Sequence, residues 1–294
     1  MHCRLLLFAL LVALAAGCGG AGQPQPARPA PSPAPARPEP DAALPREPAR
    51  LGARLATTTR ELDVAIAKWL ATRPAAGAMP PLAVTLLALD QQRIYRLMRS
   101  NPGLGQKALA TVRARLRGSA RDNFAAGRSL ARLAPRTPPR HVTLRTGPAP
   151  APGRLLAWYS EAERRFGISR WVLASVNLIE SAFGRTRSAS SAGAQGPMQF
   201  LPATWSAYGL GGNIRDPHDA ILGAANYLHA SGAPADYRRA LWSYNNSDLY
   251  VDAVLRYARQ MRRQSRRFYA YWSWQVFVRT ARGEKRLTGP GRAG

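Results

Sequence analysis

The stretch Trp171–Leu201, WVLASVNLIESAFGRTRSASSAGAQGPMQFL, joins an apolar helical pattern to a single carboxylate and a loop of small residues. The residues from Trp171 to Ile179 are almost all apolar, and a helix that is apolar on most of its faces is buried. Glu180 ends this run, although a carboxylate is costly to bury unless it is paired or protonated. The stretch therefore predicts a core helix and marks Glu180 as the first candidate for chemistry.

Helical patterns continue on both sides of this stretch, whereas strand patterns are nearly absent. The expected helices run from Arg154 to a stop at Gly167, over Arg170–Ser181 after a Ser169 cap, from Pro202 to the glycines near 209–212, from Asp216 to about Ser231, over Asp236–Ser243 and over Asp248–Gln264. Together they predict a compact all-α domain over residues 153–264.

Residues 51–134 predict a small accessory helical region. Pro74, Pro80 and Pro81 interrupt its first helix, a second run follows Leu82, and a third extends from Leu104 to Leu133 after a turn at Asn101. Nothing in this region indicates chemistry, and we interpret it as a spacer or docking element.

Two proline-rich segments, residues 19–50 and 135–152, predict an extended tether and a linker, because neither can pack a core. The tail, residues 265–294, is aromatic and basic. Its aromatic side chains are expected to pack on the domain or to touch glycan, and its last dozen residues are expected to lack structure.

Residues 1–18 predict a lipoprotein signal peptide. An apolar stretch too short to span a bilayer leads to Ala15-Ala16-Gly17-Cys18, which resembles a bacterial lipobox with Cys18 as the lipidated residue. The chain is therefore expected to be exported and membrane-anchored, facing the cell wall or periplasm. Plain secretion with cleavage nearby is the alternative.

The formal net charge of +26 raises the question of a nucleic-acid partner. The cations are nearly all arginines spread along the chain, and aromatic-flanked RNA motifs are absent from the sequence. We therefore expect no nucleic-acid partner; a basic exterior also suits a polyanionic neighbour such as cell-wall polymer or a membrane surface.

Burial of Glu180 predicts a raised pKa, because desolvation disfavours the charged carboxylate. A protonated carboxyl near neutral pH is what a general acid needs to protonate a glycosidic oxygen. The alternative is a structural ion pair with Arg185 or Arg187. Ordinary glycosidases use two carboxylates, but no Asp or Glu occurs between Ser181 and Arg215, and Asp216 has the position of a helix cap. The sequence therefore favours a mechanism with one carboxylate.

Three short motifs complete the pattern: Glu180-Ser181, the segment Gly196-Pro197-Met198-Gln199, and Ser243-Tyr244-Asn245. Their order and spacing resemble the motifs Glu-Ser, Gly-Leu-Met-Gln and Ala-Tyr-Asn of the soluble-lytic-transglycosylase (SLT) domain, which has a goose-type lysozyme-like fold. The resemblance covers about residues 153–263. Pro197 and Ser243 depart from the family pattern without touching the chemistry that it implies, though they leave the subfamily open.

The resemblance implies cleavage of the β-1,4 bond between N-acetylmuramic acid and N-acetylglucosamine, with a 1,6-anhydromuramoyl product and peptidoglycan strands as the partner. Glu180 is the implied acid and then base, without a cofactor or metal. The implied substrate-binding residues are Ser181, Ser190, Gly196, Met198, Gln199, Tyr244 and Asn245. Among them, Tyr244 is expected within hydrogen-bond reach of the Glu180 carboxyl, and Met198 either floors the groove or fills the core.

Three other functions stay open at this point. A muramidase of similar fold would use water as the nucleophile. A non-catalytic lipoprotein would bind the wall without cleaving it, and a binder of anionic polymers would depend on charge alone.

Overall fold

The structure, a computed structural model, describes residues 38–134, 137 and 144–292. The described part contains eleven helices and one small two-stranded sheet, which confirms the all-α prediction. The predicted signal peptide with Cys18, most of the tether and much of the predicted linker lie outside the described residues. Within the described ranges, no helix has both the length and the apolar character needed to cross a bilayer.

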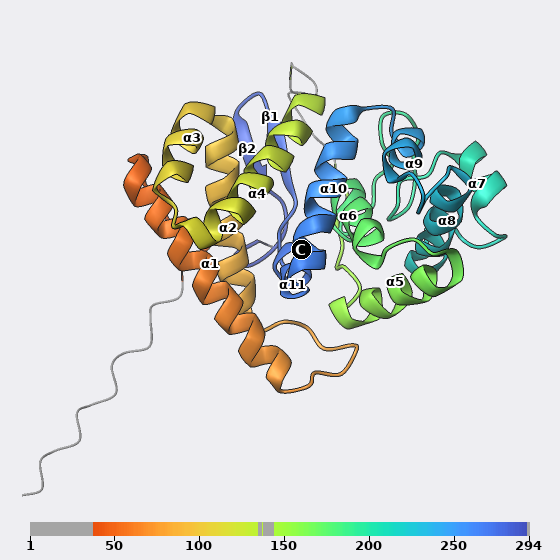
Figure 1. The fold of residues 1–294 in the computed structure, drawn as a ribbon, viewed down its shortest axis with the longest axis horizontal. Coiled ribbons are helices and arrows are strands. Elements are labelled where there is room, and N and C mark those ends of the chain that lie inside the picture. Colours follow the sequence, from red (N-terminus) through yellow and green to blue (C-terminus); the bar gives the residue numbers. More distant parts are fainter. Residues whose placement is uncertain (1–37, 135–136, 138–143, 293–294) are drawn as a thin grey trace, which may run out of the picture. The chain divides into compact units, whose positions relative to one another are not determined.

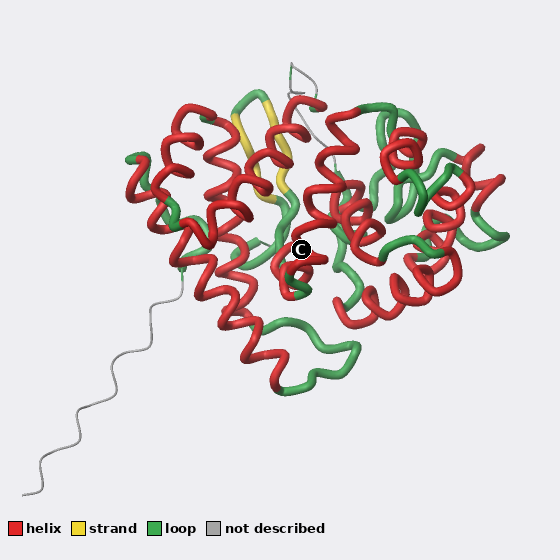
Figure 2. The backbone as a smooth tube through the Cα atoms, in the orientation of Figure 1, coloured by secondary structure: helices red, strands yellow, loops and turns green. Residues whose placement is uncertain are grey.

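The elements follow one another along the chain as Figure 1 shows. The helices are α1 (Pro48–Ala71), α2 (Leu82–Ser100), α3 (Pro102–Thr111), α4 (Ala114–Leu133), α5 (Pro152–Phe166), α6 (Arg170–Ser181), α7 (Pro202–Tyr208), α8 (Pro217–Ala230), α9 (Tyr237–Tyr244), α10 (Asp248–Arg263) and α11 (Arg266–Trp272). The strands β1 (Phe277–Thr280) and β2 (Gly283–Arg286) form an antiparallel hairpin, drawn yellow in Figure 2.

Local capping signals set several of these boundaries. The Ser169 hydroxyl accepts a hydrogen bond from the Trp171 amide at 3.4 Å, so α6 begins where the sequence predicted. The Asp216 carboxylate accepts from the amides of His218 and Asp219 and caps α8. Gly167, with a φ of 70°, ends α5 in the left-handed conformation that favours glycine.

The third run of the accessory region is not one helix. We predicted a single segment from Leu104 to Leu133, but Val112 adopts an extended backbone and separates α3 from α4. Val112 is buried, so tertiary packing of this side chain overrides the helical pattern around it.

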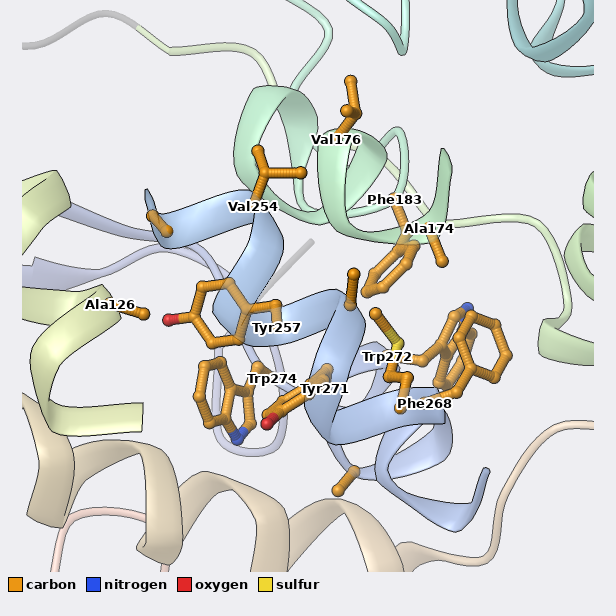
Figure 3. Close-up of a cluster of buried hydrophobic side chains, with 14 of the residues drawn as sticks. Ala126, Ala174, Val176, Phe183, Val254, Tyr257, Phe268, Tyr271, Trp272 and Trp274 are labelled. Carbon is orange, nitrogen blue, oxygen red and sulfur yellow. The ribbon is translucent and has the colours of Figure 1, made fainter. Parts of the chain in front are cut away.

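Helices of the accessory region share one hydrophobic core with the helices that follow them. In Figure 3, Ala126 of α4 approaches Tyr257 of α10. Beside this contact, the buried Asp122 carboxylate of α4 accepts hydrogen bonds from Arg256, Arg259 and Gln260 of α10, the last at 2.7 Å. These contacts fix α4 along α10.

The tail packs against this core. Tyr271, Trp272 and Trp274 are buried, and Tyr271 and Trp274 pack against the Tyr257 ring of α10 (Figure 3). Of the two expectations for the tail aromatics, packing therefore holds for these three. The expectation that the last dozen residues lack structure is wrong for Gly283–Arg286, which form β2. The reason is a set of long-range contacts, since the buried Arg286 guanidinium donates to the Asp41 carboxylate at 3.0 Å.

Candidate active site

Glu180 lies in the last turn of α6, with its side chain partly buried. The Tyr250 hydroxyl at the start of α10 donates a hydrogen bond to Glu180 Oε1 at 2.6 Å. Burial raises the pKa of the Glu180 carboxyl from its ordinary value of 4.5 to about 7, and the bond from Tyr250 opposes this rise. Near neutral pH the group therefore exists in both protonation states, as an acid that later acts as a base requires.

The alternative of a structural ion pair at Glu180 is wrong. The Arg185 guanidinium lies 4.6 Å from the centre of the Trp272 ring and donates to the Ala182 carbonyl. Arg187 donates to the Pro148 carbonyl at 2.8 Å. Neither guanidinium contributes to the pKa of Glu180.

Glu180 opens onto a cavity of about 250 Å³ built from elements far apart in the sequence. The end of α6 and Tyr257 of α10 line part of this cavity. Residues of α2, α4, the segment leading into β1 and Phe277 of β1 line most of the rest of it. The lining residues are Gln92, Tyr95, Arg96, Arg99, Asn123, Gly127, Leu130, Leu178, Ile179, Glu180, Ser181, Ala182, Thr186, Tyr257, Trp274, Gln275, Val276 and Phe277. Glu180 is the one carboxylate among these described lining residues.

The contribution of α2 and α4 was missed from the sequence, where nothing in residues 51–134 indicated chemistry. Gln92 of α2 is bound to Gln275 by two reciprocal bonds, from its side-chain amide to the Gln275 carbonyl at 2.9 Å and from the Gln275 amide to its Oε1 at 2.8 Å. Such pairing joins residues on separate helical and tail segments, and a single sequence gives no local signal for it.

An ion-pair network fastens the hairpin to α2 along this wall. The Glu284 carboxylate of β2 bonds Arg96 at 2.7 Å and Arg99 at 2.9 Å. The Arg96 guanidinium also lies 4.0 Å from the centre of the Phe277 ring, and burial lowers its pKa to about 10. The two arginines thereby present a fixed basic edge to the cavity.

The second sequence motif forms a tight loop beside α6. Gly196 has a φ of +75°, and a Cβ built there would lie 1.8 Å from the Ile214 carbonyl oxygen, so only glycine fits. Gln199 follows with a φ of 50°, and its side-chain amide donates to the Gly196 carbonyl at 2.9 Å. An antiparallel bridge between Gln195 and Phe200 closes the loop.

Ser181 and Met198 are buried inside the domain, and Ser181 also belongs to the lining of the Glu180 cavity. Ser181 is 2% exposed, and its hydroxyl donates to the Pro197 carbonyl at 2.5 Å and accepts from the Gly184 amide at 2.8 Å. The Asn177 amide bonds the same carbonyl and the Met198 sulfur. The Ser181 hydroxyl thereby ties the loop to α6, and contact of Ser181 with a sugar stays a prediction. For Met198 the structure shows the core-filling alternative.

The hydrogen bond to Glu180 that we predicted for Tyr244 is made by Tyr250 instead. The Tyr244 hydroxyl donates to the Met198 carbonyl at 2.7 Å, whereas Tyr250 makes the bond to Glu180. The two rings are parallel within 4°, with their centres 6.5 Å apart. Sequence reasoning missed Tyr250 because it lies one position before Val251, on the face of α10 that reads as core.

Ser190, Gln199 and Asn245 lie outside the set that lines the Glu180 cavity. Ser190 and Asn245 are exposed. The Ser190 hydroxyl accepts from the Ala194 amide at 3.0 Å and shapes its own loop, while Asn245 ends α9. Substrate contact by these three residues stays a prediction.

One group in the described residues has metal-ligand geometry. Ligand atoms of Asp216, His218 and Asp219 lie within 4.8 Å of one another. Asp216 already caps α8, and His218 lies 2.9 Å from the Glu161 carboxylate. These bonds explain the cluster as the start of a helix, and we assign no ion to it.

Comparison with known families adds the decisive observation. Residues 158–267 match the model of the family described as Transglycosylase SLT domain. The chain carries an SLT domain. The matched range contains Glu180, Tyr250 and the loop around Gly196, and it supports a function of the lytic transglycosylase type that acts on peptidoglycan. A search of curated proteins and a search of solved structures found no match.

Proposed function

We propose that this SLT domain cleaves the β-1,4 bond between N-acetylmuramic acid and N-acetylglucosamine and leaves 1,6-anhydromuramoyl ends. One observation carries the proposal. Glu180, the single carboxylate among the described residues of its cavity, has a pKa near 7 and is oriented by Tyr250. A glycan strand in this cavity would meet one group able to give and then take a proton.

In the first step, protonated Glu180 donates its proton to the glycosidic oxygen. The bond from that oxygen to C1 of the muramoyl ring breaks, and its electron pair leaves with the N-acetylglucosamine hydroxyl. Because Tyr250 occupies Oε1, Oε2 is the oxygen available to transfer the proton. The side chain then holds the negative charge.

In the second step, the muramoyl 6-hydroxyl oxygen attacks C1, and its proton passes to the Glu180 carboxylate. The 1,6-anhydro bond forms, and Glu180 regains its starting state. No water is consumed.

The lack of a second carboxylate among the described lining residues of the Glu180 cavity supports this route over hydrolysis. Hydrolysing glycosidases use a second carboxyl at about 5–5.5 Å for retention or about 6.5–9.5 Å for inversion. The other polar side chains among the described lining residues are mainly amides and arginines, none of which can act as the second carboxylate. The substrate's own hydroxyl fills the missing function.

Mass spectrometry of digested, purified peptidoglycan tests the proposal. The expected products are lighter by one water than the reducing ends that a muramidase releases. Glu180→Gln should lower the rate roughly 10²–10⁴-fold, since it removes the general acid. Glu161→Gln, a matched change on α5 outside the cavity, should leave the rate unchanged. Reducing ends would establish the muramidase alternative, and full activity of Glu180→Gln would remove Glu180 from the mechanism.

We also propose that the chain is exported and anchored through a lipid on Cys18. The sequence pattern of residues 1–18 and the proline-rich segment after it support this. Cys18→Ala should abolish fatty-acid labelling and release the protein from the membrane fraction. Labelling that survives the substitution would contradict the proposal.

A further inference from the structure

A second cavity, of about 560 Å³, lies beside the loop 195–200 and is basic. Three arginines from separate segments line it: Arg145 before α5, Arg187 after α6, and Arg215 before α8. No carboxylate belongs to its lining among the described residues. Elsewhere arginines of this chain meet acids, as Arg256 and Arg259 meet Asp122. The three-arginine cavity is therefore a concentration of positive charge for which the described residues supply no carboxylate counter-ion.

Backbone pairing holds two of these arginines together. An isolated antiparallel bridge joins Thr146 to Thr186, and the Arg187 amide donates to the Arg145 carbonyl at 2.9 Å. The Arg187 guanidinium is fixed further by its bond to the Pro148 carbonyl. It also packs so closely on Gly147 that a Cβ there would lie 3.0 Å from Arg187 Nε.

The third arginine is held by the loop 195–200. The Arg215 guanidinium donates to Gln195 Oε1 at 3.1 Å, and Gln195 pairs with Phe200 across the loop. Orienting the guanidinium in advance reduces the conformational entropy that binding an anion would cost.

The three-arginine cavity adjoins the Glu180 cavity. Thr186 lines both. Ser181, from the Glu180 cavity, donates to the carbonyl of Pro197, which lines the basic one. A ligand extending from Glu180 past Thr186 would enter the basic cavity.

We propose that the three-arginine cavity binds carboxylates of the peptide stem on the muramoyl residue that is cleaved at Glu180. This inference rests on the proposed function. The stem branches from the muramoyl ring, so it must leave the Glu180 cavity sideways, and it carries free carboxylates. Guanidinium groups bind carboxylates in a planar, bidentate geometry that matches this ligand.

The test compares glycan strands that carry stems with strands from which an amidase has removed them. Both are freed of phosphate-containing wall polymers, so that no other anion competes. The double variant Arg145→Gln/Arg215→Gln should lower the ratio of kcat/KM on stem-bearing strands to kcat/KM on stem-free strands about ten-fold, through KM. The matched control Arg60→Gln/Arg121→Gln removes the same charge from α1 and α4 and should leave the ratio unchanged. Amidated stems should abolish the preference of the wild type.

A single Arg145→Gln variant guards against misfolding of the double variant, because no hydrogen bond of the Arg145 side chain is found in the described residues. Binding of both kinds of strand to the Glu180→Gln chain is measured in parallel and does not depend on turnover. An unchanged ratio in the arginine variants, or an equal loss in the control pair, overturns the inference while cleavage itself stands. Failure of the wild type to cleave either strand overturns the proposed function instead, and stem-dependent binding then decides the inference alone.

Discussion

Replacing Glu180 with glutamine is expected to stabilise the fold while removing the proposed acid. The carboxyl has a pKa of about 7 in the folded chain and an ordinary value of 4.5. Folding therefore opposes ionisation of Glu180. Each tenfold change in the acid constant corresponds to about 1.4 kcal/mol, so the ionised side chain destabilises the folded chain by about 3 kcal/mol.

The pH dependence follows from the direction of this shift. Because the folded pKa lies above the unfolded one, the wild type loses stability as pH rises from about 4.5 and has lost the full amount above about pH 7. Glutamine is neutral at every pH and can still accept the bond from Tyr250. The gain in unfolding free energy of Glu180→Gln should therefore be about 1 kcal/mol at pH 5 and about 3 kcal/mol at pH 8.

Urea unfolding at both pH values measures these two gains. Glu61→Gln on α1 makes the same change of side chain outside the Glu180 cavity and is the control, with no expected growth of its effect between pH 5 and pH 8. The reasoning is refuted if Glu180→Gln is no more stable than the wild type at pH 8, or if its gain is the same at both values.

Three other substitutions test separate contacts. Tyr250→Phe removes a donor that lowers the pKa of Glu180, so the alkaline limb of kcat/KM should move up by as much as about one pH unit; a pH–rate profile that stays in place would contradict this. Gly196→Ala places a Cβ 1.8 Å from the Ile214 carbonyl at a φ of +75° and should cost at least about 3 kcal/mol, seen as a lower Tm; an unchanged Tm would disprove the clash. Glu284→Gln leaves the two α2 arginines without their carboxylate and should cost about 1–2 kcal/mol in urea unfolding, because the pair is only partly buried; a neutral result would show that the hairpin is held by its apolar contacts.

Local signals were enough to predict much of the SLT domain. The prediction for Arg170–Ser181 coincides with α6, and Asp248–Gln264 exceeds α10 by one residue. Both helices have a strong apolar period, and α6 has a capping residue before it, so their limits depend on neighbours in sequence. The raised pKa of Glu180 also followed from sequence, because the apolar helix before it implied burial.

Contacts between segments that are far apart along the chain could not be predicted from the sequence. Tyr250 reaches Glu180 across 70 positions, and its place on an amphipathic helix suggests core packing alone. The wall supplied by α2 and the tail depends on pairs such as Gln92 and Gln275, which are 183 positions apart. No spacing rule within either segment specifies such a pair.

Because the wall of the Glu180 cavity is built from segments far apart in the sequence, the raised pKa of Glu180 depends on folding. The desolvation that raises the pKa of Glu180 exists only when the elements around its cavity are assembled, and those elements span most of the described chain. Loop closure must precede contacts of such high sequence separation, so they are costly in chain entropy. A partly folded chain would hold Glu180 in water as an ordinary carboxylate, ionised at neutral pH and unable to donate a proton. The proposed catalytic function would therefore require the whole wall around Glu180 to be assembled, and not α6 alone.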